Sequence, residues 1–335
     1  MALFRGSRNL VRLVGIALTL ARHDALFPVL ALGARIPGAV PFARLGRLVR
    51  RRDAALRRPG ERLAAALCDL GPSFIKLGQL LATRADLLGE DMAEDLAMLQ
   101  DRLPPFSGDQ ARALIEAEFA RPLAELYAAF DETAVAAASI AQVHFAVTND
   151  GEEVAVKVLR PGIAQALARD LDLFRWLARL IQRMQPALRR LKPVEVVETL
   201  AQSVDLEMDL RFEAAAASEL AENFAGDPSF RVPRVDWRRT GRTVLTTGRV
   251  GGIRIDDRDA LVAAGRSISD LLRNAAAIFF KQVFRDGFFH ADQHPGNLFV
   301  APDGAVVAVD FGIMGRLDRD TRFFLADMLV GFLSG

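Results

Sequence analysis

The sequence predicts an α+β fold in which helices come first and strands follow. Up to residue 130 the apolar positions recur at helical spacing, and from Ala134 the pattern changes to a period of two. Near the C-terminal end, Asn297–Val300 and Ala305–Val309 are apolar runs separated by Pro302-Asp-Gly304, a pattern typical of a hairpin. A chain of 335 residues is long enough for two domains and a large core.

Composition indicates an ordinary folded protein, because half of the residues are apolar and a quarter are charged. The single Cys68 excludes an intramolecular disulfide and is predicted to be a buried structural thiol.

Residues 1–62 form a strongly basic segment with thirteen Arg, no Lys and three acids, so its charge is about +10 and that of the remainder about −9. Asn9–Arg22 and Phe42–Arg58 are predicted helices. The charge and the apolar stretches favour an anionic membrane surface, with a solvated charged face as the alternative. Nucleic acid is disfavoured because there is no aromatic interleaving and no nucleic-acid motif. No apolar run reaches the ~20 residues that span a bilayer, so we expect surface association.

Glu61–Pro104 is predicted to be a helical hairpin broken at Gly71-Pro72-Ser73, with Ser73 as the cap of its second helix. In that helix Lys76 and Gln79 share one face. Gly78 costs about 1 kcal/mol relative to Ala inside a helix. It therefore indicates close approach of a backbone or ligand, or simple packing of a neighbouring helix.

A lysine on a predicted apolar strand indicates an anionic partner. After a predicted helix over Gly108–Phe130, the turn Thr148–Gly151 leads to Val154–Val158, whose three valines face one way while Ala155 and Lys157 face the other. Burying an unpaired ammonium is costly, so Lys157 is expected to meet phosphates and a helix Glu. An edge-strand Lys that extends into solvent is the alternative.

Two long helices are predicted next, over Ile163–Leu188 and Val194–Glu222. The second carries three acids of interest: Glu207, Asp209 and Glu213. Asp209 and Glu213 are four residues apart, and we expect Glu213 to pair with Lys157. Glu207 could pair with Arg211 on the surface.

The next segments lead toward the C-terminal motif. Arg231–Val250 is predicted to hold two or three strands and Gly251-Gly252 a hinge. Asp257–Ala264 and Ile268–Phe284 are predicted helices.

The stretch after these helices carries the chemistry. Asp292 is followed five residues later by Asn297, and Asp310 begins an Asp-Phe-Gly triplet. In protein kinases a loop Asp lies next to the nucleophile's proton, while an Asn and the Asp of this triplet carry Mg²⁺. One carboxylate and one amide suit a hard cation that keeps several waters. A metallohydrolase cluster of His290, Asp292 and His294 is an alternative, but it does not explain Asn297 or Asp310.

Over about residues 60–315 the chain resembles the UbiB-type atypical kinases of the protein-kinase-like superfamily. The resemblance rests on six motifs in the expected order. They are Lys76-x-Gly78-Gln79 with the following Arg84-Ala-Asp86, the Ala-rich loop Ala136–His144, Lys157 with Arg160-Pro-Gly162, Glu207-x-Asp209 with Glu213, His290 to Asn297, and Asp310-Phe-Gly312.

The resemblance implies a two-lobed, protein-kinase-like fold with a family-specific N-terminal helical extension. Its expected parts are basic membrane-surface helices over 1–59, the extension over 60–130, an N-lobe over 131–250 and a partial C-lobe over 251–335. The chain ends 25 residues after Asp310, so a truncated C-lobe is expected.

The resemblance also implies that ATP or ADP binds with Mg²⁺. Lys157, held by Glu213, would contact the phosphates, Asn297 and Asp310 would hold the metal, and Asp292 would orient a water or a small hydroxyl. In the Ala-rich loop, Ala137, Ala138 and Ser139 would select the nucleotide. Ala cannot adopt the positive φ open to Gly, so this loop would fit phosphates differently from a Gly-rich loop.

Regulation is implied for Lys76, Gly78 and Gln79, which would occlude the entry of a protein substrate, and for Glu207 and Asp209. ATP hydrolysis or small-molecule phosphorylation is therefore expected rather than protein phosphorylation in trans. Ala291 replaces the Arg that commonly precedes the catalytic Asp, so control by activation-loop phosphorylation is not expected.

The implied role is support of ubiquinone biosynthesis. The implied partners are an anionic membrane, isoprenoid quinone-precursor lipids and other quinone-biosynthesis proteins, with no nucleic acid. The expected place is peripheral, on the cytoplasmic face of a bacterial inner membrane, with a mitochondrial or plastid relative as the alternative. A non-catalytic, nucleotide-switched lipid-binding chaperone is the alternative function.

Overall fold

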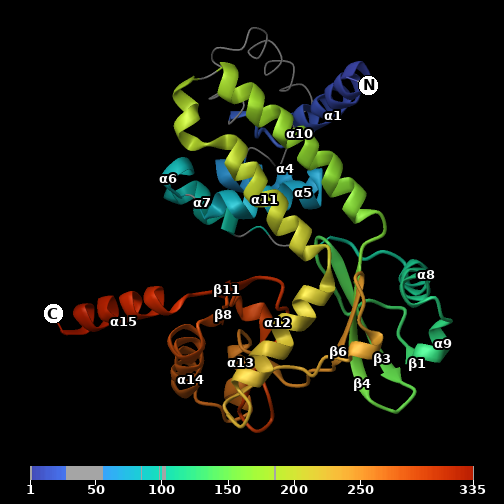
Figure 1. Cartoon of the computed structure of the whole chain (residues 1–335), viewed down its shortest axis with the longest axis vertical. Helices are drawn as coiled ribbons and strands as arrows, with labels where there is room; N and C mark the ends of the chain where they lie inside the picture. The colour runs from blue at the N-terminus through green and yellow to red at the C-terminus, as the bar shows by residue number, and fades with distance from the viewer. Residues whose placement is uncertain are drawn as a thin grey trace. The chain divides into compact units, whose positions relative to one another are not determined.

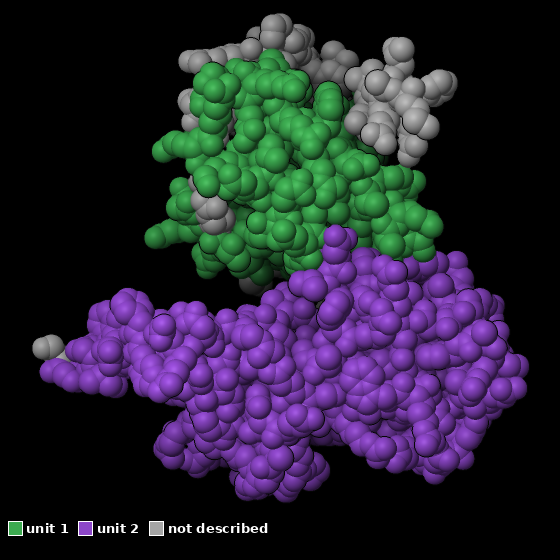
Figure 2. Space-filling view, viewed as in Figure 1, with its two compact units in different colours: residues 1–105, 137–141, 162–204 green, residues 106–136, 142–161, 205–335 purple. Residues whose placement is uncertain are grey.

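The computed structural model describes residues 2–27, 56–83, 85–97, 99, 103–184 and 186–334. Most of the predicted helix Phe42–Arg58, and Arg84 of the first motif, lie outside these residues. The chain divides into two compact units (Figure 2). One comprises residues 1–105, 137–141 and 162–204, and the other residues 106–136, 142–161 and 205–335.

The first unit is helical (Figure 1). Its elements are α1 (Ala2–Arg22), α4 (Pro59–Leu70), α5 (Pro72–Ala82), α6 (Ala85–Leu88), α7 (Glu90–Ala97), α10 (Ile163–Met184), η3 (Pro186–Leu191) and most of α11 (Pro193–Glu207). The buried faces of α5 and α10 meet through Phe74 and Phe174, whose rings lie edge to face with centroids 5.0 Å apart. Such pairs stabilise a core beyond the area that they bury.

The helix break at Gly71 was predicted correctly, but its cap was not. Gly71 has φ +103° and is itself the N-cap residue, Pro72 begins α5, and Ser73 lies buried inside the first turn. Proline suits the first helical position because its missing N–H has no partner there in any case. The proline therefore sets the start of the helix two residues before Phe74.

Helix α1 confirms the predicted helix Asn9–Arg22 and begins earlier, at Ala2. Its guanidinium at Arg12 bonds both carboxylate oxygens of Asp170 at 3.0 and 2.9 Å. Just after the helix, His23 Nε2 lies 2.8 Å from Asp69 Oδ2. Among the described residues, no helix has both the length and the apolar character needed to cross a bilayer.

The second unit contains an antiparallel sheet ordered β1 (Tyr127–Phe130), β3 (Ala141–Thr148), β4 (Glu153–Leu159) and β6 (Val244–Gly248). The short strand β2 (Ala136–Ala137) precedes β3. The predicted alternation is confirmed, because Val154, Val156 and Val158 are buried together while Lys157 lies on the opposite face.

The predicted helix Gly108–Phe130 is wrong in its second half. The structure has α8 (Gly108–Phe119), the single turn α9 (Leu123–Leu126) and then β1. Ala120 adopts a left-handed conformation with φ +51°, and Pro122 restricts the residue before it. These two residues end the helix, and Tyr127 then joins the sheet.

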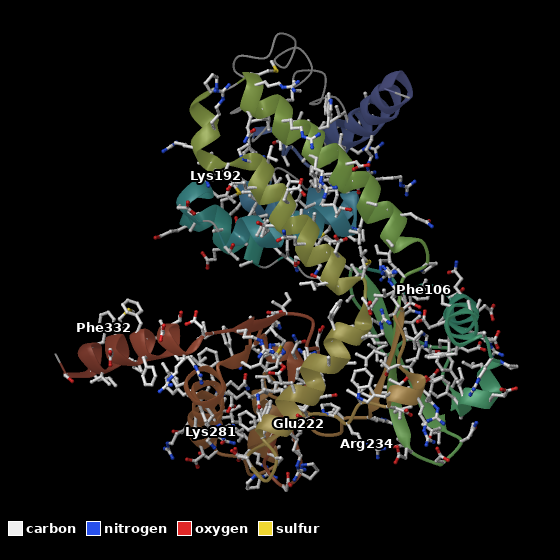
Figure 3. The ribbon with its side chains drawn as sticks, viewed as in Figure 1. Phe106, Lys192, Glu222, Arg234, Lys281 and Phe332 are labelled. Atoms are coloured by element: carbon white, nitrogen blue, oxygen red, sulfur yellow. The ribbon has the colours of Figure 1, made fainter. Side chains whose placement is uncertain are left out.

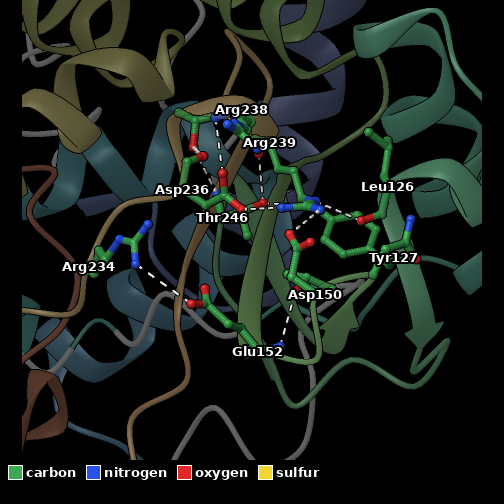
Figure 4. Close-up of polar contacts among 12 residues, drawn as sticks. Leu126, Tyr127, Asp150, Glu152, Arg234, Asp236, Arg238, Arg239 and Thr246 are labelled. Carbon is green, nitrogen blue, oxygen red and sulfur yellow. Dashed lines mark hydrogen bonds and ion pairs between the residues drawn. The ribbon is translucent and has the colours of Figure 1, made fainter.

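Tyr127 fastens β1 to β6 (Figure 4). Its hydroxyl lies 2.7 Å from Thr246 Oγ1, which in turn donates to the carbonyl of Arg239 at 2.7 Å, so the phenol is the donor. Arg239 Nε donates to the carbonyl of Leu126 at 2.7 Å. Burial raises the pKa of Tyr127 to about 12. The phenol is therefore protonated at physiological pH and remains the donor to Thr246.

The predicted helix Ile163–Leu188 is confirmed as α10, which ends at Met184. The predicted single helix Val194–Glu222 is two helices, α11 and α12 (Leu210–Asn223). Asp209 has extended dihedrals, and its carboxylate accepts from the N–H of Arg211, so it is the N-cap of α12. Asp209 and Glu213 therefore do not share a helical face, and Asp209 takes the Arg211 side chain at 2.6 Å.

The remaining chain confirms the predicted hairpin, as β9 (Leu298–Val300) and β10 (Val306–Ala308) pair antiparallel. Gly304 has φ +95° in the turn between them. They form a sheet ordered β5 (Phe230–Arg231), β10, β9, β7 (Ile253–Arg254), and β8 (Phe288–His290) pairs with β11 (Met314–Arg316). The other elements are η4 (Trp237–Arg239), α13 (Arg258–Ala263), α14 (Ile268–Phe280), η5 (Lys281–Asp286), η6 (Pro295–Asn297) and α15 (Arg319–Ser334).

The predicted helix Ile268–Phe284 differs in its last turn. The α-helix ends at Phe280, and η5 continues it as a π-helical turn up to Gly287, which caps it with φ +66°. A π turn accommodates an extra residue and shifts the side chains that follow.

Acid should destabilise the second unit through His144, which is buried and donates from Nδ1 to the carbonyl of Asp131. Burial lowers the pKa of His144, against the opposing effect of that hydrogen bond. The unfolded chain therefore takes up a proton at this ring more readily than the folded chain, so stability is lost as the pH falls below about 6.5. We expect the free energy of unfolding, measured with urea between about pH 7.5 and 5.5, to fall less steeply with pH in His144→Asn than in the parent chain.

The exposed His294 supplies the matched substitution, His294→Asn, for this comparison. Acid losses of equal steepness in the parent chain and in His144→Asn would contradict the assignment.

Candidate functional site

The site is built around Lys157, which lies on β4 between β3 and β6. Its ammonium donates to both carboxylate oxygens of Glu213 at 2.8 and 2.9 Å and to Asp310 Oδ1 at 3.1 Å. The side chain is 17% exposed. The predicted pair with Glu213 is confirmed. The alternative of a lysine on an edge strand is wrong, because β4 has a partner strand on each side.

The charges of Lys157 and Glu213 are set by their burial and by the charges of the other members of the cluster. Burial by itself would lower the pKa of Lys157, but the carboxylates of Asp310 and Glu213 outweigh it and raise that pKa above its ordinary value. Burial raises the pKa of Glu213, against the opposing effect of Lys157. Lys157 is therefore a persistent cation at neutral pH, held in a defined place where phosphate oxygens could meet it.

Glu213 reaches the cluster from the first turn of α12, whose start is fixed by the Asp209 cap. Its side chain is 8% exposed, and its Oε1 also accepts from the N–H of Phe311 at 3.4 Å. Glu213 thus joins α12 to both β4 and the Asp-Phe-Gly triplet.

Asp310 follows β10 in a left-handed conformation, with φ +65°. A non-glycine residue seldom adopts this conformation, and such residues gather at functional sites. Its carboxylate is 47% exposed and accepts from the N–H of Gly312 at 3.3 Å. One carboxylate therefore contacts Lys157 and still presents oxygen to solvent.

Asp292 and Asn297 lie on the loop that joins β8 to β9, and Asp292 is exposed. The amide of Asn297 donates to the carbonyl of Asp292 at 3.5 Å. The carbonyl of Asn297 accepts from the N–H of Val309 at 2.8 Å, next to Asp310 in the chain. The structure thus ties the predicted catalytic loop to the predicted metal-binding strand.

His290 braces this loop, a role that the sequence did not reveal. Its Nε2–H donates to the carbonyl of Asp310 at 2.6 Å, and its Nδ1 accepts from the N–H of Asp292 at 3.2 Å. Both ring nitrogens are therefore engaged by the backbone, and the His-Asp-His metal cluster is not formed. Among the described residues, no group of three or more His, Cys, Asp or Glu is arranged to hold a metal ion.

Residues 137–141 of the Ala-rich loop belong to the first unit, whereas the rest of the loop and Lys157 belong to the second. The N–H of Ala138 donates to the carbonyl of Ala141 at 2.8 Å and closes a tight turn. Ser139 is fully buried, and its hydroxyl has no hydrogen-bond partner among the residues that the structure describes. Nucleotide selection by Ala137, Ala138 and Ser139 stays a prediction.

The predicted regulatory residues of the first unit lie on α5. A Cβ on Gly78 would collide with the side chains of Leu67 and Leu99, so this glycine permits helix packing. Lys76 and Gln79 are half-buried. Their regulatory role, like that of Glu207 at the end of α11 and of the capping residue Asp209, stays a prediction.

Comparison with known proteins places this arrangement in a family. Residues 98–335 match the family described as the ABC1 atypical kinase-like domain. The chain is similar to a protein of Marinobacter nauticus named probable protein kinase UbiB, with 47% identity over 277 residues that cover 82% of this chain and 51% of the relative. A protein of the same name from Azotobacter vinelandii is 42% identical over 332 residues, covering 97% of this chain and 61% of the relative.

A solved structure is also similar, that of Rv3197 from Mycobacterium tuberculosis in complex with erythromycin. It gives a TM-score of 0.56 at 28% identity, covering 76% of this chain and 64% of that one. The chain spans about half to three fifths of the length of the two curated relatives.

These findings confirm the predicted α+β, protein-kinase-like fold. Together with the lysine–glutamate pair and the motifs that follow it, they show that the chain belongs to the ABC1 atypical kinase-like family and, within it, to the UbiB type.

Proposed function

We propose that this chain is an atypical kinase or ATPase that binds ATP or ADP with Mg²⁺ and supports ubiquinone biosynthesis. The observation that carries the proposal is the contact of Lys157 with Glu213 and Asp310 at once. Lys157 is a fixed cation that can bind phosphate, and the half-exposed carboxylate of Asp310 beside it can bind a metal ion.

The donor set fits Mg²⁺. Asp310 offers a half-exposed carboxylate, and Asn297 offers an amide from the loop tied to the same strand. Two protein oxygens leave coordination positions for water and phosphate, as Mg²⁺ prefers. When bound, the ion would neutralise the charge that develops on the transferred phosphoryl group.

The remaining roles follow from position. Asp292 is exposed at the start of the same loop, with its N–H held by His290. Its carboxylate would orient a water or a small hydroxyl for attack on the terminal phosphate, while Lys157 holds the phosphates that stay behind. Catalysis of this kind consists of positioning and electrostatic stabilisation.

The acceptor in this proposal is water or a small molecule, and protein phosphorylation in trans is not part of it. This choice rests on the family resemblance, in which Lys76, Gly78 and Gln79 would block the entry of a protein substrate. Glu207 and Asp209 would tune the site, and the Ala-rich loop with Ala137, Ala138 and Ser139 would select the nucleotide.

We place the chain peripherally at an anionic membrane, on the cytoplasmic face of a bacterial inner membrane. The net charge of about +10 over residues 1–62 supports this. On α1, Val14 and Leu18 are exposed at helical spacing, with Arg22 one turn further. Isoprenoid quinone-precursor lipids and other quinone-biosynthesis proteins are the proposed partners.

Removal of one metal-binding carboxylate tests the function. We expect Asp310→Asn to release phosphate from MgATP at least about 100-fold more slowly than the parent chain, because one electrostatic contact is lost in the transition state. Phosphate release is measured with and without anionic vesicles, and vesicles should increase it in the parent chain.

Asp303→Asn makes the same chemical change in the nearby hairpin turn, where Asp303 pairs with Arg231, and should keep parental activity. Nucleotide binding without any phosphate release would sink the enzymatic proposal and favour the lipid-binding chaperone that nucleotide switches.

A double-mutant cycle tests the lysine. Lys157→Met should weaken MgATP binding about 10- to 100-fold, the loss expected for one charge-assisted contact of about 1.5–3 kcal/mol. Glu213→Gln should weaken it less, because Glu213 acts through Lys157. The double variant should bind no more weakly than Lys157→Met, as measured by calorimetry.

Additive losses across this cycle would show that Glu213 contacts the nucleotide independently. Unchanged binding in Lys157→Met would remove the central observation from the proposal.

A further inference from the structure

We propose that Gln282 is a positioning residue of the candidate site, one that fixes the catalytic loop through His290. The proposal rests on the proposed function for its kinetic consequence, but its structural part can be tested without turnover. Gln282 lies on η5, in a part of the chain that the hydrophobic pattern predicted to be the end of an ordinary α-helix.

The π-helical turn brings Gln282 inward. Gln282 is only 1% exposed, although many residues of the preceding helix α14 are exposed to solvent. The wider turn of a π-helix shifts the residues that follow, and such turns recur at functional sites. A carboxamide buried at this depth needs hydrogen-bond partners.

Gln282 forms its hydrogen bond with the last residue of β8, the strand that leads into the loop with Asp292. Gln282 Oε1 accepts from the N–H of His290 at 2.9 Å, and this bond is fully buried. His290 is 2% exposed, and its ring lies edge to face with Phe311, with centroids 5.7 Å apart. The bond therefore fixes the end of β8 from the helical side.

His290 in turn holds the backbone of Asp292 and of Asp310, the two residues whose carboxylates are proposed to act in the site. Its ring donates to the carbonyl of Asp310 and accepts from the N–H of Asp292. The first bond holds Asp310 in its left-handed conformation, which a non-glycine residue does not favour. Loss of the Gln282 acceptor would let His290 turn, and both backbone contacts would loosen together.

The π-helical turn is itself held by the end of α12, the helix that carries Glu213. Lys281 Nζ, at the start of the turn, contacts Asp227 Oδ2 at 2.6 Å, and Arg285 donates to the carbonyl of Asn223 at 2.8 Å. Figure 3 labels Lys281 and, near the end of α12, Glu222. Gln282 therefore sits on an element fixed at both sides, as a positioning residue requires.

The test compares Gln282→Met, which keeps chain length but removes the strong acceptor, with Gln282→Glu, which keeps the acceptor. We expect the methionine variant to lower kcat for phosphate release about 10- to 100-fold with KM for MgATP within about twofold, because misplacement rather than binding is affected. The glutamate variant should restore most of kcat.

A second readout is independent of activity. The chain has four His, so the ring nitrogens of His290 can be followed by ¹⁵N NMR and assigned with His290→Asn. The parent chain should show a proton on Nε2, because Nδ1 accepts from the N–H of Asp292 and Nε2 donates to the carbonyl of Asp310. We expect this signal to move or broaden in Gln282→Met and to match the parent in Gln282→Glu.

Gln110→Met is the matched control, since it makes the same chemical change at an exposed position of α8 in the same unit, and it should leave the His290 signal and kcat unchanged. If the methionine variant does not fold, Gln282→Leu replaces it. Unchanged His290 signals on loss of the acceptor would overturn the proposal. If the parent chain releases no phosphate, the proposed function fails, and the His290 signals alone decide the role of Gln282.

Discussion

The contact of Lys157 with the buried Glu213 and the half-exposed Asp310 is the constraint on which the second unit depends. The three side chains come from β4, from α12 and from the segment after β10, so one cluster fixes the relative placement of three elements. Removing one partner of a largely buried ion pair costs several kcal/mol, so the Lys157–Glu213 pair favours the arrangement that holds β4 against α12. A folding requirement and a chemical requirement thus fall on the same residues.

The cluster also explains why the neighbouring backbone can be strained. Asp310 adopts φ +65°, and its carbonyl is held by His290 while the next N–H reaches Glu213. Strain at a functional residue persists only where its surroundings determine the conformation more than once. Here the carboxylate, the carbonyl and the following N–H are each held by a different partner.

Sequence periodicity was reliable wherever one face of an element was uniformly buried. The valines of β4 followed the two-residue period, and Lys157 stood out because it interrupted an apolar strand. The pair β9–β10 was recognised from two short apolar runs on either side of a turn. Periodicity failed where a single residue ended a helix. Ala120 with Pro122, Asp209, and the π turn after Phe280 each interrupt a pattern whose apolar spacing continues across the break. A hydrophobic pattern records which face is buried, but it does not record a local change of dihedral angle.

The sequence by itself determined which groups are available for chemistry: a lysine on an apolar strand, a glutamate to hold it, and an Asp-Asn-Asp set in the order expected of the family. These could be predicted because residue type and spacing decide which groups are available. Only the tertiary structure decided that Asp209 caps α12, that Gly78 serves helix packing, and that His290 and Gln282 brace the loop. Those roles depend on contacts between segments far apart in the chain, and the same residue types in the same local pattern would suit other partners equally well.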